Sequence, residues 1–321
     1  MERAYRFNQV AIVQKKNICK SRLDVQIESE IVRGITRPIP LIAANMASVT
    51  NAQFCSQLYQ LGALGILHRA LGEKDYLEEI TTLTNNCPVV AASIGINDYH
   101  LLQKLVKAGA NLIVVDVAHS YCDAAINVCK NIRQFYPHVK IIVGNTININ
   151  MLDEIDGWAD GLKIGCGNGS PCETAMTAGC YEPQFSAVLK FRERANELGM
   201  PIISDGSIKR PADFVKAIGA GASAVMGGQI FARCPESASP IIEVDGIKKK
   251  SYSGMASRAI QEKWRGKVHN DCPEGKTIFL DIGESVTKLL NRYCGAIRSG
   301  VSYAGFNNIN DFRKNCEFIL I

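Results

Sequence analysis

Short apolar runs recur along the 321-residue chain, and most of them are followed by a stretch of helical character. Each run is rich in β-branched residues and apolar nearly throughout, as is typical of strands buried on both faces of a parallel sheet. The runs start mostly 20 to 28 residues apart, which leaves room for one crossover helix per step. The eight runs are 41–45 (LIAAN), 64–68 (LGILH), 89–95 (VVAASIG), 112–118 (LIVVDVA), 140–145 (KIIVGN), 160–165 (DGLKIG), 201–206 (PIISDG) and 224–229 (AVMGGQ).

Helices are predicted between several of these runs. Thr50 is the expected N-cap of the helix at 51–61, and Gly109 ends the helix at 98–108. The last two begin near a proline and end at Gly199 and Gly219. The expected helices cover 51–61, 98–108, 183–198 and 211–218.

Eight strand–helix units favour a (β/α)8 TIM barrel that forms a single domain over residues 1–321. An open, doubly wound sheet shows the same alternation and stays the alternative, although no GxGxxG motif follows the first run. Two segments after the eighth run lie outside the repeat. Residues 241–253 predict a β-hairpin that turns at Asp245-Gly246, and the polar stretch 256–280 predicts a mobile flap over a binding site. We therefore expect a hairpin and flap inserted at 241–280.

Composition excludes several classes of protein. Lys and Arg exceed Asp and Glu by 36 to 31, and the resulting charge of +5 is spread along the chain, so no clustered basic face for nucleic acid is expected. No apolar stretch reaches 18 residues, and the first 16 residues lack the apolar core of a signal peptide. The 12 cysteines include no CxxC pair and lie mostly in apolar segments. We expect a cytoplasmic protein with reduced thiols and no membrane span.

In a barrel of this kind, the functional site lies at the C-terminal ends of the strands. Polar residues and glycines gather at those ends in this chain. They are Asn45, His68, Asp116, Asn145, Gly165, Asp205-Gly206 and Gly227-Gly228. Each of them also fits a turn or a helix cap, but their shared position indicates a site.

The densest polar segment is 165–180 (GCGNGSPCETAMTAGC). Its glycines allow backbone N–H groups to approach an anion closely, and Ser170 adds a hydroxyl donor. Cys172 lies in this polar loop and not in an apolar run, so it is the candidate nucleophile, with a structural cysteine as the alternative. Cys166 and Cys180 share the segment, but the absence of a CxxC pair or a nearby histidine argues against a metal site.

A second cluster follows the last two runs. Loops in these positions commonly bind phosphate in such barrels, which assigns that role to Gly206-Ser207 and Gly227-Gly228. The carboxylate of Asp205 suits the vicinal hydroxyls of a ribose. Together these residues predict a nucleoside monophosphate ligand, with glycine-rich turns that bind nothing as the alternative.

Several ordered motifs now resemble one family. They are ANM (44–46), GN (144–145), the loop around Cys172, PQFSAV (183–188), PIISDGSI (201–208) and GASAVMGG (221–228). Together, from about residue 7 to the C-terminus, they resemble the IMP dehydrogenase/GMP reductase family. The resemblance implies a purine mononucleotide substrate, a nicotinamide cofactor, a covalent thioimidate on Cys172 and a homotetramer.

Two features favour the reductase branch of that family. The short link from His68 to Val89 leaves no room for the CBS module that IMP dehydrogenases usually carry, and the flap has Arg258 and Arg265 but no tyrosine to form an Arg-Tyr pair. The segments EGK (274–276), IRSGVSYAG (297–305) and DVAHS (116–120) resemble the reductases. This implies NADPH-dependent conversion of GMP, or a related purine nucleotide, to IMP and ammonia. An IMP dehydrogenase without CBS domains, making XMP with NAD, is the first alternative, and a catalytically silent nucleotide-binding protein is the second.

The resemblance also assigns roles by motif. Cys172 would attack purine C2, while Thr174 and Glu274 would handle the proton that ammonia needs to leave. Positions that match substrate contacts are Ser170, Asp205, Gly206, Ser207, Gly227, Gly228, Tyr252, Gly254 and Met255. Positions that match the cofactor site are Asp116, Ala118, His119 and Asn145. A monovalent cation such as K⁺ would bind the backbone carbonyls of Gly165, Gly167 and Cys172.

Four positions depart from the family pattern. Ser207 replaces a glycine that follows the seventh run, and Ala256 replaces a serine near the base. Glu173 and Ala175 replace the Thr and the basic residue that usually flank the conserved threonine of reductases. Glu173 would raise the pKa of the Cys172 thiol if the two groups lie close.

Overall fold

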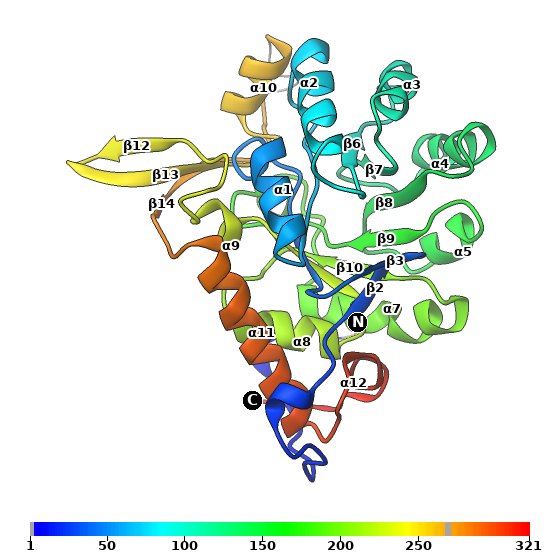
Figure 1. Cartoon of the computed structure of the whole chain (residues 1–321), viewed down its shortest axis with the longest axis vertical. Coiled ribbons are helices and arrows are strands. Elements are labelled where there is room, and N and C mark those ends of the chain that lie inside the picture. The colour runs from blue at the N-terminus through cyan, green and yellow to red at the C-terminus, as the bar shows by residue number, and fades with distance from the viewer. Residues whose placement is uncertain (1–2, 267–270) are drawn as a thin grey trace.

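The computed structural model describes residues 3–266 and 271–321, and it places eight parallel strands at the centre of the molecule (Figure 1). Their order is β5-β4-β11-β10-β9-β8-β7-β6, and a parallel bridge from Leu67 to Ala92 joins the two outer strands. The sheet therefore closes, which confirms the predicted (β/α)8 barrel. The strands are β4 (Leu41–Ala43), β5 (Leu64–Gly65), β6 (Ala91–Ile94), β7 (Leu112–Asp116), β8 (Lys140–Thr146), β9 (Gly161–Ile164), β10 (Ile202–Asp205) and β11 (Ala224–Gly227).

The apolar character of these strands follows from burial on both faces. In β7, Leu112 and Val114 belong to the core inside the barrel, whereas Ile113 and Val115 belong to the core between the strands and the helices. The hairpin of β2 (Ser29–Val32) and β3 (Ile35–Arg37) adds Ile31 to the inner core. A strand with apolar neighbours on both sides cannot show the alternation of a half-exposed strand.

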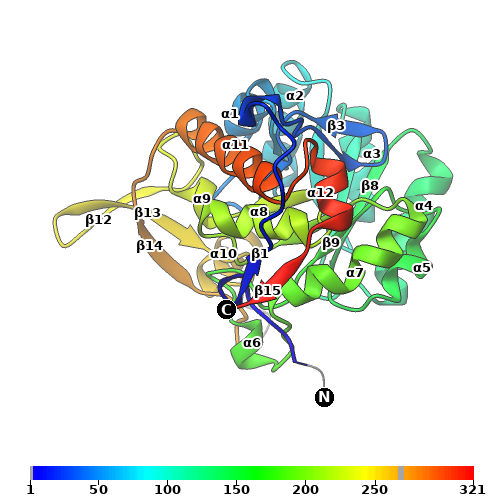
Figure 2. The same ribbon diagram turned by 90° about the horizontal axis from the view of Figure 1, so that it is seen from below.

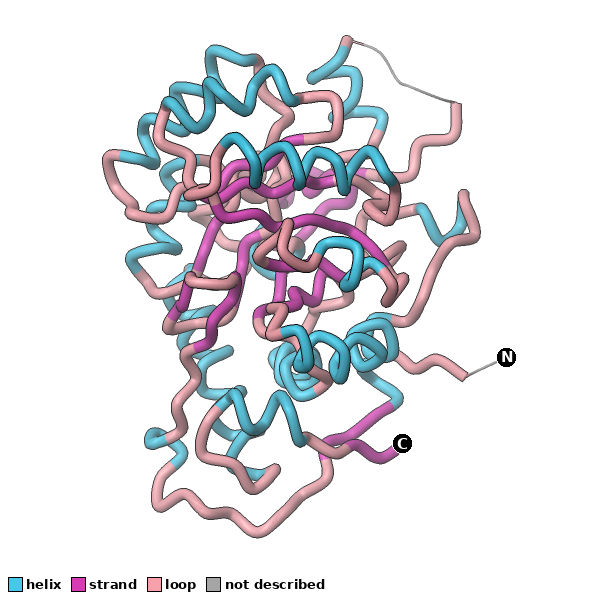
Figure 3. Tube along the Cα trace, turned by 90° about the vertical axis from the view of Figure 1, so that its right-hand side faces the viewer, coloured by secondary structure: helices cyan, strands magenta, loops and turns pink. Residues whose placement is uncertain are grey.

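Helices cover the outside of the barrel (Figures 1 and 3). Most of them follow a strand and return the chain to the start of the next one, as the spacing of the runs predicts. None of the helices in the described ranges combines the length and the apolarity needed to cross a membrane. The outer helices are α1 (Ala52–Gln60), α2 (Glu73–Thr84), α3 (Tyr99–Lys107), α4 (Asp123–Phe135), α5 (Met151–Ile155), α7 (Gln184–Leu198), α8 (Pro211–Gly219), α11 (Val286–Tyr303) and α12 (Ile309–Asn315).

The helix ends agree with the sequence in two cases and differ in two. Gly109, with φ 111°, follows Ala108, the C-cap of α3, as predicted. Gly199 adopts a left-handed conformation, with φ 57°, and ends α7 as predicted. The predicted N-cap of α1 was wrong, because Asn51 accepts the capping bond from the Phe54 N–H, while the Thr50 hydroxyl donates to the Ile66 carbonyl. Helix α8 includes Gly219 instead of ending before it, and Ala220 is its C-cap.

A three-stranded antiparallel sheet projects from the barrel after α9 (Gln229–Ala232) (Figure 1). Strands β12 (Ile241–Val244) and β13 (Ile247–Ser253) form the predicted hairpin. Its turn residues Asp245 and Gly246 both have positive φ, at 52° and 74°, as a type I′ turn requires. The expected flap is not one long loop. It contains α10 (Arg258–Arg265) and β14 (Thr277–Asp281), and its residues 267–270 lie outside the described ranges.

The two ends of the chain meet on the outside of the barrel, where Phe7 and Phe318 both pack on Phe185 in the first turn of α7 (Figure 2). Strand β1 (Val10–Ile12) pairs with β15 (Phe318–Leu320) in antiparallel fashion. The short helices η1 (Phe7–Gln9) and η2 (Arg22–Asp24) flank β1, and α6 (Thr174–Thr177) lies in the loop after β9.

Candidate active site

A cavity of about 420 Å³ opens at the C-terminal ends of the barrel strands. Loops from across the chain line it, including the cysteine loop after β9 and the segment around Glu274. His119 and Gly227 are outside its lining; Gly227 packs instead against Ile230, which a Cβ at that position would meet at 2.7 Å. The predicted residues that line the cavity are Asp116, Ala118, Asn145, Gly165, Gly167, Ser170, Cys172, Thr174, Asp205, Gly206, Ser207, Gly228, Tyr252, Gly254, Met255 and Glu274.

Cys172, Thr174 and Glu274 form a continuous hydrogen-bonded chain at this cavity. The Cys172 Sγ donates to the Thr174 Oγ1 at 3.2 Å, and the Thr174 hydroxyl donates to the Glu274 Oε2 at 2.7 Å. Cys172 and Glu274 are 102 residues apart in sequence, so the fold alone brings them together. A hydroxyl that links a thiol to a carboxylate can pass a proton between the reacting centre and the acid.

Two short backbone segments hold this chain in place. Cys172 pairs with Gly275 in an antiparallel bridge, the Glu173 N–H donates to the Glu274 carbonyl at 2.9 Å, and the Lys276 N–H donates to the Pro171 carbonyl at 2.9 Å. Gly275 also approaches a third segment closely, because it bridges to Ser257 and a Cβ there would lie 2.8 Å from the Ser257 nitrogen. Backbone hydrogen bonds therefore hold the loop that carries Cys172 against the loop that carries Glu274.

The Glu173 side chain forms an ion pair with the Lys276 ammonium. The sequence alone did not determine whether this carboxylate lies close to the Cys172 thiol. Its side chain is instead engaged with a cation from the segment that carries Glu274. Glu173, which departs from the family pattern, therefore has an ion-pair partner in the loop that carries Glu274.

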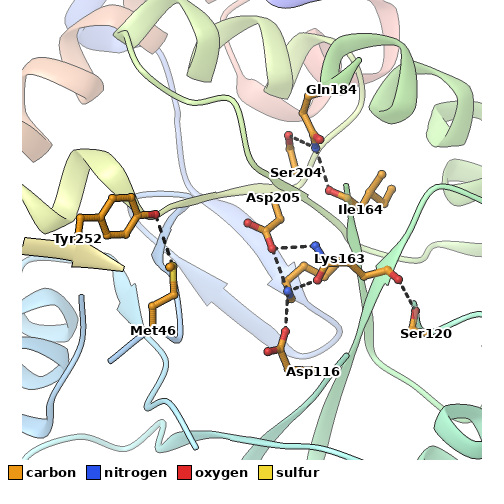
Figure 4. Close-up of polar contacts among 10 residues, drawn as sticks. Met46, Asp116, Ser120, Lys163, Ile164, Gln184, Ser204, Asp205 and Tyr252 are labelled. Atoms are coloured by element: carbon orange, nitrogen blue, oxygen red, sulfur yellow. Dashed lines mark hydrogen bonds and ion pairs between the residues drawn. The ribbon is translucent and has the colours of Figure 1, made fainter. Parts of the chain in front are cut away.

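A buried ammonium group lies at the centre of the strand ends (Figure 4). The Lys163 Nζ is 2.9 Å from the Asp116 Oδ1 and 2.9 Å from the Asp205 Oδ2, and it also donates to the Asn145 Oδ1. The Asn145 Nδ2 donates to the same Asp205 oxygen at 2.9 Å. Only 3% of the Lys163 side chain is exposed. Sequence reasoning missed this residue, although a lysine inside an apolar strand was the signal that could have revealed it.

The charges in this cluster stabilise one another. Burial alone would lower the pKa of the Lys163 ammonium, but Asp116 and Asp205 raise it well above its usual value. Burial alone would raise the pKa of Asp116, but the charge of Lys163 outweighs this effect and lowers it. Lys163 therefore stays protonated and holds two of the predicted ligand-binding carboxylates in fixed positions.

The end of the cavity near β10 and β11 is rich in small polar groups. The Ser170 hydroxyl donates to the Gln229 Oε1 at 2.5 Å, and the Ser207 N–H donates to the Asn168 carbonyl at 2.9 Å. The Tyr252 hydroxyl lies against Gly228, where a Cβ would be only 2.1 Å from it. The same hydroxyl points at the Met46 sulfur, 3.5 Å away (Figure 4). Serine at 207 keeps its hydroxyl within the loop, 3.3 Å from the Asn168 carbonyl.

Two further cysteines lie at the base of the cysteine loop. The Cys166 Sγ is 3.9 Å from the Cys180 Sγ and also donates to the Cys180 carbonyl at 3.4 Å. Burial and the neighbouring Cys180 raise the pKa of the Cys166 thiol to about 12. Within the described ranges, no group of three or more His, Cys, Asp or Glu side chains is arranged to hold a metal ion.

Comparisons with known proteins agree with this geometry. A family model described as the IMP dehydrogenase / GMP reductase domain matches residues 4–321. A GMP reductase from Caenorhabditis elegans is 31% identical over 326 residues, which cover 98% of this chain and 91% of the relative. A GMP reductase from Onchocerca volvulus is 30% identical over 328 residues, covering 98% and 90%. An inosine-5′-monophosphate dehydrogenase from Borreliella burgdorferi is 28% identical over 380 residues, covering 99% and 94%.

Proposed function

The chain belongs to the IMP dehydrogenase / GMP reductase family of purine nucleotide oxidoreductases, and we propose that it is an NADPH-dependent GMP reductase. The observation that carries this proposal is the Cys172–Thr174–Glu274 chain, with its contacts of 3.2 and 2.7 Å. Reductive deamination needs a nucleophile for purine C2 and a proton for the departing amine. This hydrogen-bonded chain supplies both at one point of the cavity.

The proposed reaction has two halves. In the first, the Cys172 sulfur bonds to C2 of GMP and the C2–N bond breaks, so that the amine leaves as ammonia with a proton from the Thr174–Glu274 pair. When bound, NADPH supplies the hydride that replaces sulfur on C2 and yields IMP and NADP⁺. The C–S bond breaks in that second half, and the electron pair returns to Cys172.

The rest of the cavity fits a purine mononucleotide. We assign the ribose hydroxyls to Asp205, whose position the Lys163 ammonium fixes at 2.9 Å. We assign phosphate binding to the Ser170 and Tyr252 hydroxyls and to the backbone of Gly206, Ser207, Gly227 and Gly228. Gly254 and Met255 would contact the base. The role of Gly227 rests on the resemblance alone, since this residue is not part of the cavity lining.

The cavity also extends toward a surface suited to a nicotinamide dinucleotide. The Arg69 and Arg265 guanidinium groups lie 5.1 and 4.3 Å from the centre of the Trp264 ring, and all three residues line the cavity. Two cations and an aromatic face suit the phosphates and rings of such a cofactor. We assign its binding to this cluster with Asp116, Ala118 and Asn145; His119 lies outside the lining.

The proposal includes three features that the resemblance implies. They are a K⁺ ion on the carbonyls of Gly165, Gly167 and Cys172, assembly as a homotetramer, and a cytoplasmic location. Turnover with and without K⁺ and sedimentation of the purified protein test the first two.

An IMP dehydrogenase is the second candidate, because the Borreliella burgdorferi relative matches 99% of the chain. One experiment separates the candidates: the protein is incubated with GMP and NADPH, and separately with IMP and NAD. We expect equal amounts of NADPH oxidised, ammonia released and IMP formed in the first mixture. Turnover only in the second mixture would contradict the proposal, and GMP binding without turnover would support a silent binding protein instead.

A further inference from the structure

Gln229 lines two separate cavities. It lies directly after Gly228 at the start of α9 and lines the phosphate end of the active-site cavity. It also lines a smaller cavity of about 180 Å³, together with Lys209, Arg233 and Arg292. Gln229 is therefore part of the wall between the proposed substrate site and a second cavity.

The orientation of the Gln229 amide is fixed by its neighbour in the cysteine loop. The Ser170 hydroxyl donates to the Gln229 Oε1 at 2.5 Å, which engages the carbonyl side of the amide. Among the residues that the structure describes, none accepts a hydrogen bond from the Gln229 NH₂ group. Two donors remain for a ligand that carries acceptor oxygens.

The space behind this wall is rich in cations. Arg292 is paired with Glu284 at 2.5 Å, and the Arg233 Nε donates to the Asp281 carbonyl at 3.2 Å. Lys209 forms no ion pair within the described ranges. Three basic side chains and one carboxylate, Glu284, line this second cavity, so it attracts anions.

We propose that Gln229 restricts the substrate to a nucleoside monophosphate. Its NH₂ group donates to the terminal phosphate, and its side chain keeps a second phosphate from reaching the basic cavity lined by Lys209, Arg233 and Arg292. This inference rests on the proposed function, because it takes the end of the cavity near Ser170 as the phosphate site.

The test compares the binding of GMP and GDP to the native protein and to Gln229→Ala, by calorimetry. The native protein binds GMP more tightly than GDP. In Gln229→Ala, GMP binding weakens by about tenfold, because a hydrogen bond to a charged group is lost. GDP binding strengthens relative to GMP by at least about tenfold, because the second phosphate gains the basic cavity.

Two further variants keep the test specific. Gln229→Glu has nearly the same shape but carries a negative charge, and it should weaken GMP binding more than Gln229→Ala does. Adding Arg233→Gln to Gln229→Ala should remove the gain for GDP, and matched thermal unfolding of all variants confirms that they are folded. An unchanged ratio of GMP to GDP affinity in folded Gln229→Ala would overturn the inference while leaving the proposed function intact. A native protein that binds neither nucleotide would instead overturn the proposed function itself.

Discussion

At the residue scale, Lys163 is the charged group that organises the cavity. It pairs with both Asp116 and Asp205 from a buried position, with 3% of its side chain exposed. A lysine in a strand is usually interpreted as solvent-facing, which is why sequence reasoning did not place it between two carboxylates. Its role depends on the barrel, which brings β7, β9 and β10 side by side.

Lys163→Met should therefore destabilise the protein strongly. Removing one partner of a buried ion pair leaves uncompensated charge and costs about 3–5 kcal/mol in the free energy of unfolding. Lys190→Met is the matched control, since the Lys190–Glu182 pair is at the surface and is worth about 0–1 kcal/mol. Urea unfolding at neutral pH measures both changes. Equal losses in the two variants would contradict the assigned role of Lys163.

A second prediction at the residue scale concerns the Thr174 hydroxyl and the proton that reaches the departing amine. Thr174→Val keeps the shape of the side chain but removes the hydroxyl between Cys172 and Glu274. We expect kcat with GMP and NADPH to fall by about 10²-fold, a typical loss of general acid–base catalysis, with little change in GMP affinity. Thr177→Val is the control in the same helix, because the Thr177 hydroxyl bonds only the Glu173 carbonyl within the described ranges. Native turnover in Thr174→Val would remove the relay from the mechanism.

At the element scale, the paired segments 171–173 and 274–276 form the scaffold of the site. Gly275→Ala should disturb this pairing, because the new Cβ would lie 2.8 Å from the Ser257 nitrogen. Misplacing Glu274 in this way should lower kcat by about 10²-fold. Gly295→Ala in α11 is the control: a Cβ there meets no atom within 4 Å, so the change should add about 0.5–1 kcal/mol of stability. Steady-state kinetics of both variants, with thermal unfolding, tests this, and full activity in Gly275→Ala would contradict it.

The elements also show where sequence reasoning succeeds. The eight strands were predictable because burial on both faces makes them continuous apolar runs. The hairpin was predictable because Asp245-Gly246 suits a turn with two positive φ angles. Helix α10 and strand β14 were missed. Helix α10 (RAIQEKWR) is short and charged and has no buried residue, and β14 depends on β13 as its pairing partner.

At the scale of the whole molecule, a charge on the flap helix α10 lowers the pKa of His68 in the barrel. This buried residue at the end of the second apolar run has its pKa lowered from 6.5 to about 4, first by burial and then by the charge of Lys263 in α10. The unfolded chain therefore takes up a proton near pH 6.5, whereas the folded protein does so only near pH 4. The contribution of His68 to stability is complete above pH 6.5 and is lost as the pH falls toward 4.

We expect the free energy of unfolding to fall by about 1.4 kcal/mol per pH unit from His68 within that window. His68→Gln should show a shallower decrease between pH 6.5 and 4, as measured by urea unfolding at several pH values. His100→Gln is the control, since that histidine is exposed on α3. Identical pH profiles for His68→Gln and the native protein would contradict this assignment.

The whole fold also sets the limits of what the chain alone could reveal. The barrel and the cysteine loop were predictable from local patterns and motifs. Contacts between distant segments that were not predicted, such as Lys163 with Asp205 and Ser170 with Gln229, exist only once the barrel closes. A role assigned by motif does not guarantee that the residue lines the cavity. His119 and Gly227 both lie outside its lining.

The central claim is that the Cys172 sulfur bonds to purine C2 while ammonia leaves. The most direct measurement is mass spectrometry of protein quenched in acid during turnover of GMP with NADPH. We expect a peptide that contains Cys172 to carry the nucleotide without its amino group, and we expect neither this adduct nor any ammonia in Cys172→Ala. Ammonia release at the native rate by Cys172→Ala would contradict the account.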